Sequence, residues 1–566
     1  MNKSTIQTLI DKVIGKKGLI RVPSWWMRKV LMQITDWVQE GDDANGEKIV
    51  KVKEEADGKI STLETNTNSK ISTLETNTNA KIITLDNSTK AALIELKKSL
   101  HTQRCVVVKT GTSAGYVVVD GVTQEVPANT QKIVTYVDTF GFYNNKTANQ
   151  WLIFIGLAVA DASSITDMSR MFYSCQSLTS LDLTGLDTSA VTNMESMFYY
   201  CTDLTSLNLT GLDTSAVTNM TAMFKNCKKL TSLDLSSFDT SAVTSMASMF
   251  SYCSSLTSLD LTGLDTSAVT NMDYMFSGCT GLTSLDLSTF DTSVVKSMNS
   301  MFSDCYLLAS INLSGLDTSA VTTMDAMFKG CEKLTSLDLS GLDATSVENM
   351  NSMFSNCYLL ASINLSGFST SAVTSMASMF YRCNRLTSLD LSSFNTSAVT
   401  SMASMFYDCA LLASIDLSSF NTSSVTNMSK MFDGCQSLTS LDLSTFDTSA
   451  VTSMWRMFSC TRLTSLDLSS FDTSAVDSME EMFYCPSLTS LILGPNFFKT
   501  PNVAMVNFSY SPKWINDTVV TSLVTNSYNR ATAGLRTMTL QLSANTKAAL
   551  TDGQKAAITA KGYTIA

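Results

Sequence analysis

Between residues 165 and 493 the apolar positions recur with a period of 26 residues. In one unit they are Met220, Met223, Phe224, Cys227, Leu230, Leu233, Leu235, Phe238 and Val243. The first four lie at offsets of 0, 3, 4 and 7, which predicts a short helix with one buried face. Leu233 and Leu235 alternate with polar residues, which predicts a short strand. Each unit is therefore expected to form one coil with a strand, a turn and about two helical turns.

The cysteines follow the same period. Apart from Cys105, they stand at 175, 201, 227, 253, 279, 305, 331, 357, 383, 409, 435, 460 and 485. A fixed period of this length indicates a solenoid whose strands lie side by side in a parallel sheet. Stacked cysteines in identical niches are expected to be small buried hydrophobes; disulfides between coils are the weaker alternative.

The last two cysteine steps are 25 residues, and the residue that is lost falls between Phe and Cys. The strand and turn spacings are intact, so the sheet register should continue. We expect the last two coils to end their helices early. Trp455 lies beside this irregularity and is predicted to mark a binding hot spot.

Units such as Leu230–Phe250 resemble the 26-residue repeat of bacterial surface proteins, the BspA-like branch of leucine-rich repeat proteins. The resemblance covers residues 165–493. It implies an α/β solenoid of leucine-rich-repeat type, with parallel strands and short helices. It also implies a role in adhesion without enzymatic activity, often at a bacterial cell surface.

A second repeat, of 11 residues, precedes the array. Its apolar pairs predict a long helix with a right-handed supercoil, which needs partner chains to bury them. The residues expected to form the oligomer contact are Ile60, Leu63, Ile71, Leu74, Ile82, Leu85, Leu93 and Leu96. A parallel homotrimer is favoured, and other oligomers or a monomeric linker helix remain open.

The first 45 residues carry half of the tryptophans. The expected docking residues are Trp25, Trp26, Arg28 and Trp37, although a self-contained helical hairpin explains the chemistry equally well. The run Pro23–Leu31 resembles the N-terminal segment of fibre-type proteins from phages and prophages of Bacteroides, including crAss-like phages. The resemblance implies docking to virion structural proteins.

Five parts are thus expected. They are a helical docking segment (1–45), a coiled-coil stalk (46–103), a small β-rich adaptor that caps the array (104–164), thirteen repeats (165–493) and a C-terminal cap (494–566). In the adaptor, strands are predicted near 106–108, 116–119, 133–137 and 151–159, with a hairpin turn at Asp120-Gly121. In the C-terminal cap, helices are predicted over 516–526 and 545–561, and a strand over 538–542.

Composition narrows the function. Fifty acidic against 39 basic residues give a net charge of −11, which is unsuited to nucleic acid or an anionic membrane. The single histidine, His101, disfavours histidine-based catalysis and zinc sites. Charged residues near the N-terminus interrupt any signal peptide, and no apolar run is long enough to span a membrane. No metal and no cofactor is expected.

One column of acidic residues could carry catalysis. Asp182, Asp234, Asp260, Asp286, Asp338, Asp390, Asp416, Asp442 and Asp467 share one phase on the strand face, and Asn208, Asn312 and Asn364 fill the other units. Neighbours about 5 Å apart would match the carboxylates of a retaining glycosidase. Every coil offers the same pair, however, so solvation, cation binding or stacked hydrogen bonds is the favoured role, and the chain is expected not to be an enzyme.

Positions that depart from the repeat are better candidates for binding. The aromatic residues beside the Met-Met-Phe-Cys segment are predicted to contact a receptor, namely Tyr199, Tyr200, Tyr252, Tyr274, Tyr381, Tyr407, Trp455 and Tyr484. The sequence therefore predicts a virion fibre or spike that binds a host-surface glycan or protein. The alternatives are a bacterial surface adhesin and a fibre-borne polysaccharide depolymerase.

Overall fold

The computed structural model describes residues 104–110, 115–119, 122–126, 131–136, 140–142, 152–158, 166–183, 188–460, 462–509, 525 and 527–566. All of them belong to one compact unit, residues 101–566. The predicted docking residues Trp25, Trp26, Arg28 and Trp37 and the whole predicted stalk lie outside the described residues. Of the helix expected over 516–526, all but residue 525 lies outside them.

Six strands precede the repeats: β1 (Arg104–Thr110), β2 (Gly115–Val119), β3 (Val122–Val126), β4 (Gln131–Tyr136), β5 (Phe140–Phe142) and β6 (Leu152–Ala158). Strand β1 pairs antiparallel with β4 and β6, and β2 pairs antiparallel with β3 and β5. Strand β6 then pairs in parallel with β7 (Ser180–Asp182) of the first coil. The first coil therefore continues a sheet instead of leaving an open strand edge.

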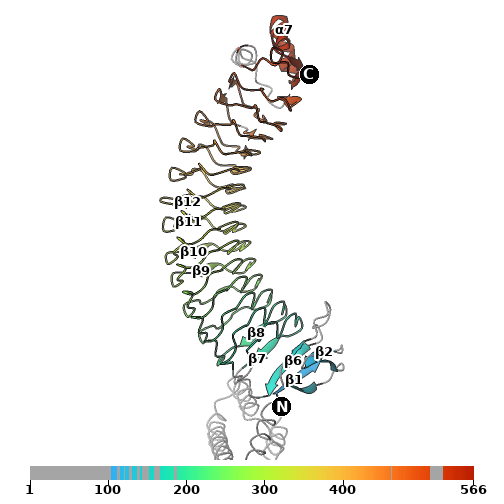
Figure 1. The fold of residues 1–566 in the computed structure, drawn as a ribbon, viewed down its shortest axis with the longest axis vertical. Helices are drawn as coiled ribbons and strands as arrows, with labels where there is room; N and C mark the ends of the chain where they lie inside the picture. Colours follow the sequence, from blue (N-terminus) through green and yellow to red (C-terminus); the bar gives the residue numbers. More distant parts are fainter. Residues whose placement is uncertain are drawn as a thin grey trace, which may run out of the picture. The chain divides into compact units, whose positions relative to one another are not determined.

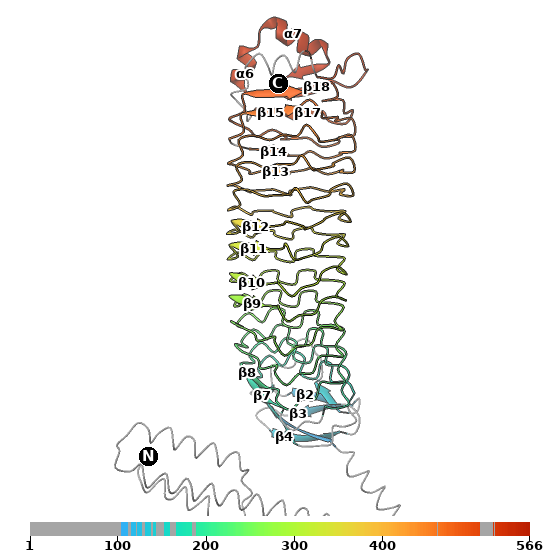
Figure 2. The same ribbon diagram turned by 90° about the vertical axis from the view of Figure 1, so that its left-hand side faces the viewer.

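The repeats form a parallel β-solenoid, as predicted. Its short strands include β8 (Ser206–Asn208), β9 (Ser284–Asp286), β10 (Ser310–Asn312), β11 (Ser336–Asp338) and β12 (Ser362–Asn364), which follow one another along one edge of the stack (Figure 2). Each paired strand is shifted by one coil, as in Ser310↔Ser284. A second column of twelve parallel bridges runs without interruption from Asp167 to Ser478. The coils consequently stack one above another along the whole array (Figure 1).

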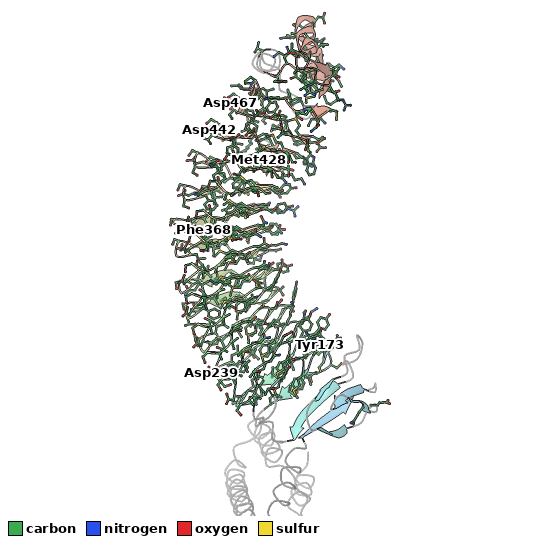
Figure 3. All side chains as sticks on the ribbon, viewed as in Figure 1. Tyr173, Asp239, Phe368, Met428, Asp442 and Asp467 are labelled. Atoms are coloured by element: carbon green, nitrogen blue, oxygen red, sulfur yellow. The ribbon has the colours of Figure 1, made fainter. Side chains whose placement is uncertain are left out.

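The apolar positions of the repeat form one continuous core. Met, Phe, Cys and Leu of successive coils are buried at the same places, and Met428 lies in the middle of the stack (Figure 3). The phenylalanine that precedes each cysteine stacks on its counterpart in the next coil. The ring centroids along this column, from Phe172 to Phe483, are 5.3–6.1 Å apart.

The helix predicted over the Met-Met-Phe-Cys segment is wrong. The segment is a run of tight turns in which the backbone N–H groups alternate between two kinds of acceptor. The N–H of Met223 donates to the carbonyl of Met220 at 3.2 Å, whereas the N–H of Phe224 donates to Met249 of the next coil at 2.9 Å. Ala222 and Asn226 have φ angles of 55° and 65°, and a left-handed residue of this kind ends a helical turn.

Coil spacing explains this difference. Parallel strands in a sheet stand about 4.8 Å apart, whereas an α-helix with its side chains is about 10 Å across. Both edges of the array are bonded at strand spacing, because the bridges from Asp167 to Ser478 run beside the predicted helices. A helix in every coil would not fit this spacing. The offsets of 0, 3, 4 and 7 therefore reflect two consecutive turns, which bury the same four residues that one face of a helix would bury.

The irregularity at the last coils lies where the sequence indicates, but its consequence differs. Strand register is preserved, since β15 (Ser465–Leu468) pairs with β16 (Ser490–Leu493) residue by residue. Arg456 keeps a left-handed φ of 52°, and the residue that is missing is the second left-handed one, before Cys460. The second turn is replaced there by a short extended pair, β13 (Phe432–Asp433) with β14 (Phe458–Ser459).

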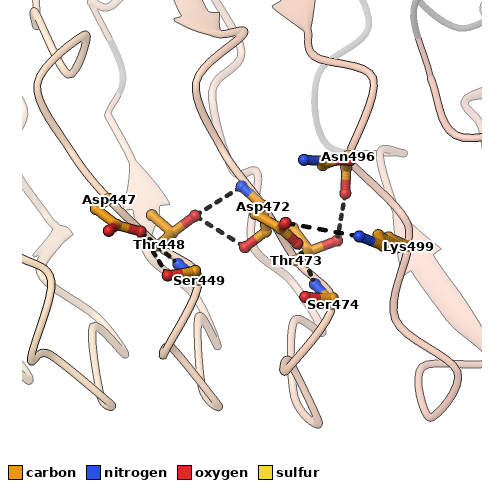
Figure 4. A network of polar contacts seen from close by, with 8 residues as sticks. All are labelled: Asp447, Thr448, Ser449, Asp472, Thr473, Ser474, Asn496 and Lys499. Carbon is orange, nitrogen blue, oxygen red and sulfur yellow. Dashed lines mark hydrogen bonds and ion pairs between the residues drawn. The ribbon is translucent and has the colours of Figure 1, made fainter.

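A ladder of buried threonines joins the turns on the edge of the stack that lies opposite the Met-Met-Phe-Cys turns. Thr448 Oγ1 donates to the carbonyl of Asp472 in the next coil at 2.9 Å and accepts from its N–H at 2.9 Å (Figure 4). The preceding Asp447 caps its own turn by accepting from the N–H and Oγ of Ser449. The same arrangement recurs along the array, with buried Ala344 in the threonine slot of one coil. The turn residues are therefore part of the stacking.

The C-terminal end covers the last coil. Strands β17 (Met505–Asn507), β18 (Met538–Gln541) and β19 (Tyr563–Ile565) form a parallel sheet. The single helix predicted over 545–561 is two helices, α6 (Ala544–Ala549) and α7 (Asp552–Ala560), because Thr551 starts a second helix with a capping box to Gln554. Phe508 stacks on Phe483 at 5.0 Å and so extends the phenylalanine column into this cap.

The cap also buries a charged side chain. Arg530 is fully buried, and its guanidinium donates to the carbonyls of Phe498, Thr500 and Arg536 at 2.6–3.0 Å. Burial lowers the pKa of this guanidinium. Neutral carbonyls at the end of the array thus bind the one arginine that is fully enclosed among the described residues.

The thirteen cysteines of the array are free and buried, as the period indicates. Each thiol from Cys201 onward points at a phenylalanine carbonyl of a preceding coil; Cys253 Sγ, for example, donates to Phe224 at 3.0 Å. Burial raises the pKa of Cys253, Cys305, Cys357 and Cys409 to about 12. At neutral pH these groups are therefore thiols, which react slowly.

We predict that replacing Thr396 by valine destabilises the protein by about 1–3 kcal/mol, because the carbonyl and N–H of Asn421 lose their buried partner. Thr400→Val is the matched control, since that hydroxyl is exposed and its loss should change stability by less than about 0.5 kcal/mol. Chemical denaturation measures both. Equal losses would contradict the ladder.

We predict that the array cysteines of a Cys105→Ser protein resist a thiol-labelling reagent at neutral pH. Labelling should become fast and reach thirteen thiols only in denaturant, because burial blocks access and disfavours the thiolate. Mass spectrometry counts the labels over time. Rapid labelling of several array cysteines in the native protein would contradict the closed column.

Candidate functional site

The turns of the Met-Met-Phe-Cys segment carry the residues that escape the repeat. Two residues before each phenylalanine, and two residues after it except at Phe458 and Phe483, the backbone has positive φ. The exposed and half-buried side chains of these turns lie at or next to these positions, beside the buried Met and Cys. Figure 3 places Tyr173 of this edge and Asp239 of the threonine edge at opposite sides of the stack. The slot two residues before the phenylalanine holds Ser or Ala in most coils, so larger side chains stand out there.

The largest such group lies between residues 381 and 456. Tyr381 and Tyr407 of adjacent coils stack with centroids 4.6 Å apart and ring planes within 8°. The ammonium group of Lys430 lies 5.6 Å from the Tyr407 ring centroid and 4.5 Å from that of Trp455. Trp455 is 38% exposed. We call Tyr381, Tyr407, Lys430 and Trp455 the aromatic–basic rim.

Ion pairs flank the rim. Arg382 lies 5.3 Å from the centroid of its neighbour Tyr381 and 3.8 Å from the carboxylate of Asp408. Arg456 Nε lies 3.1 Å from Asp433 Oδ2, and a second nitrogen lies 3.8 Å from Glu481. Burial raises the pKa of Asp433, and the nearby Arg456 partly offsets this effect. The rim thus combines flat aromatic surface with cations held by fixed partners.

The rim brings together three of the eight residues predicted from the sequence, Tyr381, Tyr407 and Trp455. Tyr199 stacks on Tyr173 at 4.9 Å and on Tyr200 at 6.0 Å in the first coils. Tyr252, Tyr274 and Tyr484 are 45%, 42% and 43% exposed in coils of their own. The eight residues therefore do not form one site. Their role in binding a receptor stays a prediction.

Sequence reasoning missed Lys430, Arg456 and their acidic partners. Aligning the coils does show the signal, because Lys430 and Arg456 occupy a slot that holds Ser or Ala in most coils. The sequence alone could not show that Lys430 would lie between two rings. That contact depends on three consecutive coils, which place Lys430 between Tyr407 of the preceding coil and Trp455 of the following coil.

The acidic column of the strand face serves as turn caps. From Asp234 onward each carboxylate accepts from the N–H two residues on, as Asp234 does from Ser236 at 3.0 Å. Asn312 and Asn364 donate to Asp286 and Asp338 of the preceding coil, both at 3.0 Å. Hydrogen bonds from the serine two residues on lower the pKa of Asp234, Asp286 and Asp338. Within the described part of the chain, no cluster of three His, Cys, Asp or Glu residues could hold a metal ion.

The fold and its edges define a class of protein, a repeat solenoid with a uniform core and variable turns. The chain belongs to the family described as "Mycoplasma protein of unknown function, DUF285", whose matches at residues 140–257, 201–310, 225–336, 302–414 and 374–491 together cover more than half of it. None of the curated proteins compared with the chain matches it.

Two of the similar solved structures come from bacterial leucine rich proteins. One is a leucine rich cell surface protein from Faecalibacterium prausnitzii, with 22% identity, a TM-score of 0.28, and coverage of 50% of this chain and 78% of that one. The other is a leucine rich repeat protein of T. pallidum, with 17% identity, a TM-score of 0.17, and coverage of 39% and 72%. In the part of the chain that the structure describes, no helix has the length and apolar character needed to cross a membrane.

We predict a pH effect from the turn carboxylates, with Asp447 as the example. Hydrogen bonds from Ser449 lower the pKa of Asp447 below the usual 3.8. A lowered folded-state pKa stabilises the fold above the unfolded-state value, and the stabilisation is lost as the pH falls through the folded-state pKa. Asp447→Asn keeps the acceptor, as Asn421 does naturally toward Ser423, but removes the charge.

The unaltered protein should therefore melt at a higher temperature than Asp447→Asn at pH 7, and the difference should shrink as the pH falls below 3.8, the usual pKa of an aspartate. Thermal unfolding across this pH range measures it. A difference that stays constant or grows on acidification would contradict the assignment.

Proposed function

We propose that this chain is a non-enzymatic attachment protein whose solenoid binds a surface glycan or protein through the aromatic–basic rim. The observation that carries the proposal is Trp455, which is more than one third exposed and has Lys430 against its ring. The core does not require a large ring there, because other coils place small residues in the same slot. Exposed Trp, Tyr and Arg are typical anchors of protein and glycan recognition.

The non-enzymatic part of the proposal is supported by the carboxylates. A glycosidase needs one carboxyl group that is protonated near neutral pH, hence one with a raised pKa. Asp234, Asp260 and Asp286 of the strand face instead have lowered pKa values, because each accepts hydrogen bonds at a turn. Similar neighbours recur along the array, so a polysaccharide depolymerase is the weaker candidate.

Two settings for such a protein are considered. The resemblance of Pro23–Leu31 to phage fibre proteins and the 11-residue repeat favour a virion fibre. In that setting the N-terminus would dock to the particle and the stalk would be a trimer. The BspA-like repeat pattern favours a bacterial surface adhesin. Antibody labelling of intact phage particles and of intact bacteria distinguishes these settings, since only one of the two should carry the protein.

We predict that Trp455→Ala weakens binding of the labelled full chain to susceptible Bacteroides cells by about tenfold or more, in line with the loss of an aromatic anchor. Its melting temperature should change little, because the side chain is exposed. Tyr306→Ala is the matched control, as Tyr306 is 42% exposed but lies several coils away. Flow cytometry on a panel of strains measures the binding.

Unaltered binding of Trp455→Ala, or equal losses for both variants, would contradict the role of the rim. A large drop in melting temperature would show that Trp455 serves packing.

A further inference from the structure

The residues two positions after each cysteine form a column along the array, and in the middle of the array this column alternates between leucine and a basic residue. From coil to coil it holds Leu307, Lys333, Leu359, Arg385 and Leu411, a strict alternation of leucine with a basic residue. We call these five residues the Leu/basic column. Leu307 and Leu411 are 46% and 39% exposed, and Lys333 and Arg385 are also exposed. Leu359 between them is half-buried. Leucines that remain accessible at a fixed spacing need an explanation.

Neighbours in this slot are close enough to interact. Three and four coils before Leu307, Lys229 and Asp203 occupy the same slot and form an ion pair of 2.8 Å. The backbone beside the column is also in register, since Ala309 donates to Thr283 and Ala361 to Thr335, both at 2.9 Å. The Leu/basic column is therefore a continuous row along the solenoid axis.

The basic groups in the row are left available. Lys229 is neutralised by the acid in the adjacent coil, whereas the neighbours of Lys333 and Arg385 in the slot are leucines. Among the residues that the structure describes, neither Lys333 nor Arg385 has a carboxylate within ion-pair distance. The chain as a whole is acidic, with a net charge of −11. A row of basic side chains without acidic partners therefore differs from the rest of the surface and should attract a negatively charged ligand.

The alternation has a period of two coils. The ten residues Tyr306–Gly315 recur without change at Tyr358–Gly367, 52 positions later. Residues next to the column are less regular, because Glu332 gives way to Asn384 and Tyr358 to Ala410. The leucine and the basic charge persist through these changes, which points to the column itself as the functional unit.

We infer that the Leu/basic column binds a linear anionic polysaccharide that carries one negative charge on every second sugar. Coils about 4.8 Å apart place the basic groups about 10 Å apart, which is comparable to the length of a disaccharide unit in an extended chain. Each cation would then pair with the acidic sugar, and each leucine would contact the C–H face of the sugar between. This inference rests on the proposed attachment function and names the class of ligand.

An extended peptide fits the row less well. Its side chains return to the same face every two residues, about 6.6–7 Å, which does not match the spacing of the basic groups. Each exposed ion pair is worth little by itself, so affinity would come from repetition along the polymer. Binding should accordingly weaken with rising salt.

The test uses the full chain and immobilised hyaluronate, in which every second sugar is a uronate. Dextran is the neutral probe, polygalacturonate the probe with a charge on every sugar, and poly-glutamate the peptide probe. We expect binding to hyaluronate in preference to the other three. Lys333→Ala with Arg385→Ala should weaken it by about tenfold or more, and Leu359→Ser should weaken it to a smaller extent.

The control pair, Lys296→Ala with Lys547→Ala, removes the same charge outside the column and should bind hyaluronate as the unaltered chain does. Absence of hyaluronate binding, equal losses for the two pairs, or preference for poly-glutamate would overturn the inference. The proposed attachment function is tested separately, because it depends on Trp455. If Trp455→Ala loses cell binding while the Lys333/Arg385 double variant keeps it, the attachment function stands and the acidic-glycan inference is rejected.

Discussion

The hydrogen bonds between consecutive coils are the constraint on which the rest of the structure depends. On both edges of the array the backbone of one coil bonds to the next at the spacing of a parallel sheet. This spacing stacks the phenylalanine rings, encloses the thiols and leaves no room for helices. It also fixes which side chains are neighbours, because a residue in one coil meets its counterpart 25 or 26 positions away.

Much of the fold could be predicted from the 26-residue period. The period indicates a parallel solenoid, buried cysteines and a preserved register at the two short coils, and the structure agrees on each. It could not separate a helix from two turns, because Met220, Met223, Phe224 and Cys227 lie on one buried face in either conformation. The deciding information was the spacing between coils, which is a property of the assembled stack.

The candidate site was predictable only in part. Exposed aromatic residues stand out in sequence because they break the repeat, and Trp455 was found in this way. The position of Lys430 between Tyr407 and Trp455 depends on contacts between three coils. The same holds for the Leu/basic column, whose meaning lies in what neighbouring coils place beside each cation. A uniform core with a few variable columns therefore separates stability from recognition.

Deletion of one whole coil tests the central claim most directly. Removing residues 323–348 joins Thr322 to Asn349 and restores every bond between coils, so the shortened protein should unfold in one cooperative transition near the melting temperature of the parent. Removing residues 323–335 deletes half a coil and should abolish cooperative unfolding, because the register is lost on both edges. Similar melting curves for the two deletions, or collapse of the whole-coil deletion, would contradict the account.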